Sequence, residues 1–142
     1  MSGFLLDTVA LSATRVPARN PAMQAWLDGH RSADLYLSTI SFGEIERGIA
    51  TARDQNLAEQ LRAWLENVVD VYTDWTLAFD IGAARYWGER LGALAREGVV
   101  VSVVDSMIAA TAIVNELTVV TRNTRHFTPF GVSTVNPWEG EP

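Results

Sequence analysis

Three acidic residues each follow an apolar, strand-like run, at a point where the pattern predicts the start of a helix. The acids are Asp7, Glu44 and Asp105, and the apolar runs before them are residues 4–6, 35–37 and 99–101. In an open α/β sheet the ends of parallel strands line one crevice, where ligands bind. Carboxylates far apart in the sequence are therefore expected to meet there, and such a cluster stays ionised at low cost only around a cation.

A carboxylate cluster of this kind suits phosphodiester hydrolysis. Mg²⁺ and Mn²⁺ prefer hard oxygen donors, take a few carboxylates and keep several waters. A bound ion lowers the pKa of a water and places it in line with the phosphate, and a second ion can stabilise the leaving oxygen. We therefore interpret Asp7, Glu44 and Asp105 as catalytic residues that coordinate a divalent metal.

Helix capping is the competing explanation for each acid taken alone. Ser41 and Glu44 have the spacing of a capping box, in which serine and acid satisfy free amides at a helix start. Ser102 and Asp105 repeat that spacing, and Asp7 can cap the helix that follows it. Each cap contributes about 1 kcal/mol. Separate caps need no common location, so the joint placement at one sheet edge favours a shared site.

The elements that position these acids alternate between strands and helices. Strands are predicted at residues 4–6, 35–38, 69–73, 117–121 and 132–135, and helices at residues 21–27, 41–52, 54–67, 80–98 and 103–115. Such alternation indicates parallel strands, right-handed crossovers and helices on both faces. We predict one domain over residues 1–142, an α/β fold built as a three-layer α/β/α sandwich with a mainly parallel sheet.

Composition narrows the class of protein. The chain has 142 residues, of which 48% are apolar and 20% charged, as in one globular domain. Its net charge of −6 argues against a large basic surface that binds nucleic acid, although smaller basic patches are compatible with this charge. The chain has no cysteine, which excludes thiolate metal sites. Without a signal-peptide pattern or an apolar run of roughly 20 residues, we expect a cytoplasmic protein with no membrane contact.

Four segments and a closing tripeptide match one family in residue type and in order. They are Phe4-Leu5-Leu6-Asp7-Thr8, residues 38–49, residues 105–112, residues 117–123 and Asn136-Pro137-Trp138. At these positions the chain resembles the PIN-domain ribonucleases, most closely the VapC-type toxins of bacterial toxin–antitoxin pairs. The likeness runs from the first predicted strand to the last and so covers nearly the whole chain.

The resemblance implies a fold, an activity and partners. It implies an α/β/α sandwich and a metal-dependent endoribonuclease that hydrolyses structured RNA. It also implies a small cognate antitoxin, which blocks the crevice and lays an apolar segment against surface helices, and a homodimer or a higher toxin–antitoxin assembly. By matching position, Asp7, Glu44 and Asp105 would be the metal ligands, with Mg²⁺ or Mn²⁺ as the cofactor.

The chain departs from the family pattern at two positions. Val9 stands where the family usually has asparagine, and His126 stands where it usually has a fourth acid. An imidazole suits Mn²⁺ better than Mg²⁺ and is a poor ligand when protonated. We therefore interpret His126 and Asn123 as holding a water or the scissile phosphate, with a surface histidine as the alternative. Thr8 and Arg122 are further candidates for such contacts, Arg122 because arginine forks bind phosphate.

Two other functions stay open. Val9 and His126 could leave a catalytically impaired PIN-fold module that binds RNA or a protein partner without cutting. A different α/β phosphotransfer or hydrolase enzyme is the second alternative. The sequence argues against that alternative, because it contains no Gly-x-x-x-x-Gly-Lys loop, no Gly-x-Ser-x-Gly elbow and no cysteine nucleophile.

Overall fold

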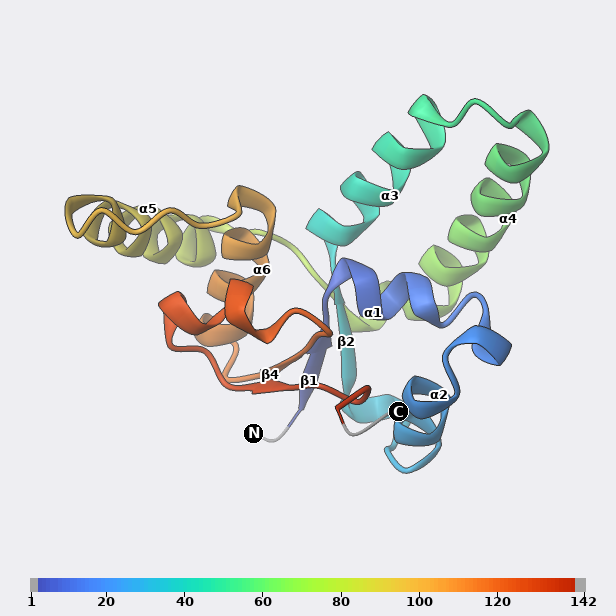
Figure 1. The fold of residues 1–142 in the computed structure, drawn as a ribbon, viewed down its shortest axis with the longest axis horizontal. Helices are drawn as coiled ribbons and strands as arrows, with labels where there is room; N and C mark the ends of the chain where they lie inside the picture. Colours follow the sequence, from blue (N-terminus) through green and yellow to red (C-terminus); the bar gives the residue numbers. More distant parts are fainter. Residues whose placement is uncertain (1–2, 140–142) are drawn as a thin grey trace.

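A five-stranded sheet forms the centre of the computed structural model, which describes residues 3–139 (Figure 1). Its strands are β1 (Phe4–Leu6), β2 (Leu35–Ser38), β3 (Thr76–Leu77), β4 (Thr118–Val120) and β5 (Thr134–Val135). They are ordered β3-β2-β1-β4-β5, and every pairing is parallel. Leu5 pairs with Tyr36 of β2 on one side and with Val119 of β4 on the other, which makes β1 the central strand.

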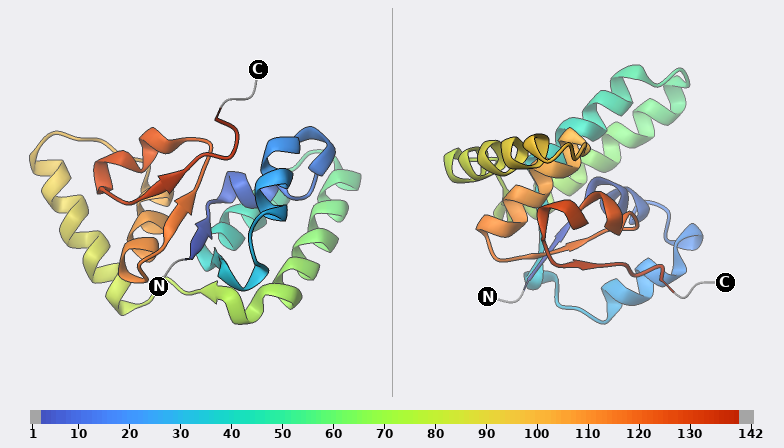
Figure 2. Two further views of the ribbon diagram at one scale, coloured as in Figure 1. Left: turned by 90° about the horizontal axis from the view of Figure 1, so that it is seen from below. Right: turned by 60° about the vertical axis from the view of Figure 1, so that its left-hand side comes forward.

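Within residues 3–139, six α-helices cover the two faces of the sheet (Figure 2). α1 (Thr8–Ala13), α2 (Pro21–Asp28), α3 (Thr39–Thr51) and α4 (Gln55–Tyr72) cover one face, and α5 (Ile81–Arg96) and α6 (Val103–Val114) cover the other. Strand side chains alternate between the faces, so Leu6 packs in the core beneath α1–α4 and Leu5 in the core beneath α5 and α6. The predicted three-layer α/β/α sandwich is confirmed. No helix within residues 3–139 is both long and apolar enough to cross a membrane.

The predicted capping box at Ser41 and Glu44 is wrong. β2 runs directly into α3, so the helix begins at Thr39 and its N-cap is Ser38, whose hydroxyl accepts a 3.0 Å hydrogen bond from the amide of Ile40. Ser41 is completely buried inside the helix. The other two caps are confirmed. Asp7 accepts from the amide of Ala10 at the start of α1, and Ser102 accepts from the amide of Asp105 at the start of α6.

The strand predictions at residues 69–73 and 99–101 are also wrong. Residues 69–72 continue α4, because the helical spacing of Leu65, Val68 and Tyr72 carries its buried stripe onward, and the strand comes later, as β3. The apolar run at residues 99–101 forms no strand and links α5 to α6, with Val100 94% exposed. Asp105 therefore follows a connecting segment and not a strand, although it still lies in the first turn of a helix.

Candidate active site

The candidate site lies at the carboxyl ends of the central strands. The chain leaves β1 towards β2 and leaves β4 towards β5, so the connections diverge between these two neighbours, and a crevice is expected at that point. Asp7 follows β1 directly and Thr121 follows β4. Glu44 lies in the second turn of α3, and Asp105 lies in the first turn of α6.

Asp7 forms the buried floor of this crevice. Only 2% of the residue is exposed, and its pKa is raised from 3.8 to about 6. Burial is the largest cause, and the negative charges of Asp105 and Glu44 raise the pKa further. Hydrogen bonds from the side chain of Thr121 and the amide of Ala10 act in the opposite direction. The structure thus brings the three predicted acids close enough for their charges to interact.

Thr8 holds the side chain of Glu44. Its Oγ1 donates to Glu44 Oε1 at 2.5 Å and lies 3.0 Å from the hydroxyl of Ser41. Because a hydroxyl carries one proton, Ser41 donates to Thr8 while Thr8 donates to Glu44. Sequence reasoning named Thr8 as a candidate contact but assigned Ser41 to a helix cap. The position of Ser41 one helical turn before Glu44 was the available signal that its hydroxyl could support the contact between Thr8 and Glu44.

His126 holds the side chain of Asp105. Its Nδ1 lies 2.9 Å from Asp105 Oδ2, and the histidine sits in a short 3-10 turn, η4 (Thr124–His126). Asn123 is exposed just before this turn, and its backbone N–H donates a 2.9 Å hydrogen bond to the hydroxyl of Thr121. Thr121 in turn donates to Asp7, a role that sequence reasoning missed. The remaining departure from the family pattern, Val9, is 45% exposed on α1.

The oxygen donors of the crevice fit a hard divalent cation. Within residues 3–139 no three acidic or histidine side chains are grouped closely enough to coordinate one ion. Glu44 contacts Thr8, and Asp105 contacts His126. Mg²⁺ does not need such a cage, because it keeps several waters and is usually held by one or two carboxylates. A cation beside Asp7 would also offset the three interacting negative charges. The residues therefore fit Mg²⁺ or Mn²⁺.

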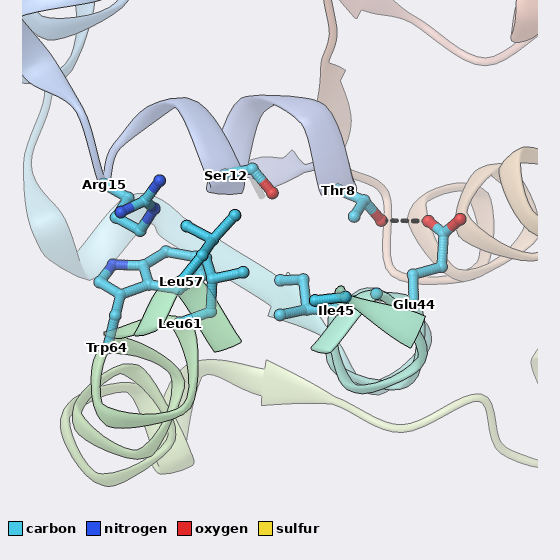
Figure 3. Close-up of a pocket in the computed structure, with 10 residues that line it drawn as sticks. Thr8, Ser12, Arg15, Glu44, Ile45, Leu57, Leu61 and Trp64 are labelled. Atoms are coloured by element: carbon cyan, nitrogen blue, oxygen red, sulfur yellow. Dashed lines mark hydrogen bonds between the residues drawn. The ribbon is translucent and has the colours of Figure 1, made fainter. Parts of the chain in front are cut away.

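A groove of about 330 Å³ leads away from Glu44 between α1, α3 and α4 (Figure 3). Its walls include the apolar side chains of Ile45, Ala52, Leu57, Leu61 and Trp64. Thr8 and Glu44 lie at one end, while Arg15 and Trp64 lie at the other (Figure 3). The groove is thus an apolar channel with a carboxylate at the end that faces the candidate site.

Comparison with known proteins identifies the family. The PIN domain family matches residues 4–129, which is most of the chain. This chain belongs to the PIN domain family. The family prediction made from the four sequence segments is therefore confirmed.

Relatives over almost the full length carry names that fit the predicted VapC-type resemblance. The plasmid stability protein StbB of Pseudomonas syringae pv. tomato is 34% identical over 96% of this chain and 99% of its own length. VapC ribonuclease Y4jK of Sinorhizobium fredii is 31% identical over 96% of this chain and 98% of its own. Toxin FitB of Neisseria gonorrhoeae is 33% identical over 95% of this chain and 98% of its own.

Solved structures of toxin–antitoxin proteins share this PIN fold. The crystal structure of FitAcB from Neisseria gonorrhoeae superimposes with a TM-score of 0.86 at 32% identity, covering 96% of this chain and 99% of that chain. The structure of FitAB bound to an IR36 DNA fragment gives a TM-score of 0.85 at 31% identity, with 98% of both chains covered.

Proposed function

We propose that this chain is a VapC-type endoribonuclease toxin that depends on Mg²⁺ or Mn²⁺ and is neutralised by a cognate antitoxin. Its family and its relatives named as VapC ribonuclease and toxin FitB support this assignment. The structural observation that supports it is the set of interacting carboxylates at the carboxyl edge of the sheet. In this proposal Asp7, Glu44 and Asp105 are the catalytic, metal-coordinating residues, and structured RNA is the substrate.

Hydrogen bonds fix the side chain of each of the three acids at the edge of the crevice. Asp7, Glu44 and Asp105 would hold the divalent ion, which would supply positive charge at the phosphate and a more acidic water for hydrolysis. Asp7 is fixed by the Ala10 amide and the Thr121 hydroxyl. Thr8 orients Glu44, and His126 orients Asp105. His126 and Asn123 lie exposed at the rim, where their remaining polar groups can hold a water or the scissile phosphate.

Cleavage by purified protein tests the proposal. Transfer RNA is incubated with the native protein and with Asp7→Asn, in Mg²⁺, in Mn²⁺ and in a chelator. We expect cleavage only by the native protein and only with a metal. In cells we expect growth arrest that co-expression of the cognate antitoxin relieves. Equal cleavage by native protein and variant would exclude Asp7 from the chemistry.

The competing function is a PIN-fold module that binds RNA or a partner without cutting. The two departures at Val9 and His126 are the observations that favour it. Calorimetry with Mg²⁺ and Mn²⁺ separates the two functions, because the module would hold no ion in the millimolar range and would leave RNA intact. A bound ion together with cleavage supports the nuclease.

We place the antitoxin in the groove beside Glu44. Its apolar walls suit an apolar segment, and the carboxylate of Glu44 at its end suits a basic side chain that would also obstruct the crevice. Such a segment would explain neutralisation by direct occlusion of the site. We further expect the toxin to form a homodimer or a higher assembly with its antitoxin, which sedimentation analysis of the free toxin and of the complex measures.

A further inference from the structure

Arg122 is a free cation held against an indole ring at the rim of the crevice. Its guanidinium carbon lies 5.2 Å from the ring centre of Trp138, within the range of a cation–π interaction. Arg122 is exposed and directly follows Thr121, the residue that donates to Asp7. Neither ion pair found among residues 3–139 involves Arg122. The positive charge of Arg122 therefore stays available for a ligand.

Trp138 is a fixed platform for this arginine. It is only 5% exposed, and its indole N–H donates a 3.3 Å hydrogen bond to Asn20, the N-cap of α2. Its amide donates to Asn136 Oδ1 at 2.9 Å, and the side chain of Asn136 lies 3.5 Å from the carbonyl oxygen of Arg122. These contacts tie the segment after β4 to the segment after β5 and to the start of α2.

The position of Arg122 over the ring of Trp138 suits a phosphate contact. A cation–π interaction uses the face of the guanidinium and leaves the N–H groups along its edge free for bidentate contacts with oxygen anions. Immobilising the long side chain in advance also reduces the entropy lost when an anion binds. The chain carries a net charge of −6 and three carboxylates in the crevice, so RNA needs such a cation close to the site.

We propose that Arg122 binds a backbone phosphate of the RNA substrate and that Trp138 is the positioning residue that holds it ready. This inference rests on the proposed nuclease function. It predicts that both residues act on RNA binding, and hence on KM, and leave the chemical step and kcat unchanged.

Arg122→Gln tests the phosphate contact, with Arg96→Gln as the matched control. Both residues are exposed and both changes remove one positive charge, but Arg96 lies in the last turn of α5 and not at the carboxyl ends of β1 and β4, where the candidate site lies. Affinity for a fluorescein-labelled single-stranded RNA of mixed sequence is measured against salt concentration in the inactive Asp7→Asn background. Steady-state kinetics with transfer RNA use the native background.

We expect Arg122→Gln to weaken RNA binding roughly tenfold and to raise KM by a similar factor. The slope of log affinity against log salt concentration should become shallower by about 0.7. Arg96→Gln should change neither affinity nor slope. Equal effects of the two substitutions would overturn the proposed contact between Arg122 and RNA. The nuclease proposal would still stand as long as the native protein cleaves RNA. A native protein that neither bound nor cleaved RNA would overturn both proposals.

A double-mutant cycle tests Trp138. Trp138→Leu should cost about threefold in RNA affinity when Arg122 is present and nothing when Arg122→Gln is also present. Trp138→Phe should keep most of the affinity. Additive losses from Trp138→Leu and Arg122→Gln would overturn the positioning role.

An NMR titration keeps the test decisive if Trp138→Leu fails to fold. The indole N–H resonance of Trp138, assigned by its loss in Trp138→Phe, should shift when RNA is added to the Asp7→Asn protein. The shift should vanish with Arg122→Gln, which leaves the buried indole in place. A shift that persists without Arg122 would contradict the proposal.

Discussion

The Thr8 hydroxyl donates a 2.5 Å hydrogen bond to Glu44 Oε1 and so links the first residue of α1 to the second turn of α3. Because Thr8 directly follows Asp7, this bond sets where the carboxylate of Glu44 lies relative to the floor of the crevice. The buried hydroxyl of Ser41 supports Thr8 from within α3. Two neutral hydroxyls, and not the backbone alone, thus hold one of the three acids in place.

Removing the Thr8 hydroxyl should impair catalysis without unfolding the protein. Thr8→Val keeps the shape of the side chain but leaves Glu44 free to rotate, and loss of such a supporting contact typically costs about tenfold to hundredfold in activity. Thr8→Ser restores the donor and should retain most of the activity. The measurement is kcat/KM on transfer RNA, alongside unfolding midpoints. Equal rates for the valine and serine variants would show that the contact is dispensable.

Asp7→Asn should stabilise the metal-free protein near neutral pH. The native pKa of Asp7 is about 6 against 3.8 for a free carboxyl, so the folded state binds the proton more tightly than the unfolded state. The protonated Asp7 therefore adds to the free energy of unfolding. This stabilisation is fully present below about pH 4 and is lost as the pH rises through about 6, because folding must then bury a charged carboxylate. The shift corresponds to about 3 kcal/mol.

Denaturant unfolding in a chelator, at about pH 5 and about pH 7.5, measures this effect. The stability gained by Asp7→Asn should be larger at the higher pH, while cleavage is lost. A gain of equal size at both pH values would mean that Asp7 is not protonated preferentially in the folded state.

The sequence predicted the strands and helices that carry Asp7 better than it predicted the contacts around it. A short apolar run followed by Asp-Thr at residues 4–8 is enough to indicate a buried strand and a capped helix. The spacing of Ser41 to Glu44 did not decide its role, because the same spacing fits both a supporting contact and a capping box. Only the direct passage from β2 into α3 decides that Ser38 takes the cap and Ser41 turns inward.

Contacts between residues far apart in the sequence could not be predicted from local sequence patterns either. The contact between Asp105 and His126 spans 21 positions, and the contact between Trp138 and Asn20 spans 118. No helical or strand period encodes such a pair. Each depends on how the segments after β4 and β5 pack on the rest of the sheet. The apolar run at residues 99–101 shows the reverse error, since hydrophobicity alone indicated a strand where a connecting segment lies.

His126→Asp should change the metal preference. An imidazole beside Asp105 favours Mn²⁺, whereas an additional carboxylate favours Mg²⁺. We expect the ratio of cleavage rates in Mg²⁺ to those in Mn²⁺ to rise several-fold in this variant. His126→Gln serves as the neutral control and should slow cleavage in both metals. Rates that match the native protein for both variants in both metals would remove His126 from the mechanism.

Leu57→Glu should separate antitoxin binding from catalysis. Leu57 is 39% exposed and lines the groove, so a glutamate there leaves the core intact but places a negative charge against the apolar segment expected to dock. The complex should weaken at least about tenfold, which is 1.4 kcal/mol. Cleavage of RNA should stay at the native rate, because Leu57 lies beside Arg15 and Trp64, at the end of the groove away from Thr8 and Glu44 (Figure 3).

Val71→Glu is the matched control for this prediction. Val71 lies on the same helix and is 57% exposed, but it does not line the groove beside Glu44. Calorimetry with the purified antitoxin should find native affinity for Val71→Glu and a loss for Leu57→Glu. In cells, the antitoxin should still protect against Val71→Glu and fail against Leu57→Glu. Tight binding by Leu57→Glu would place the antitoxin on another surface, since a docked apolar segment cannot ignore a charge buried beneath it.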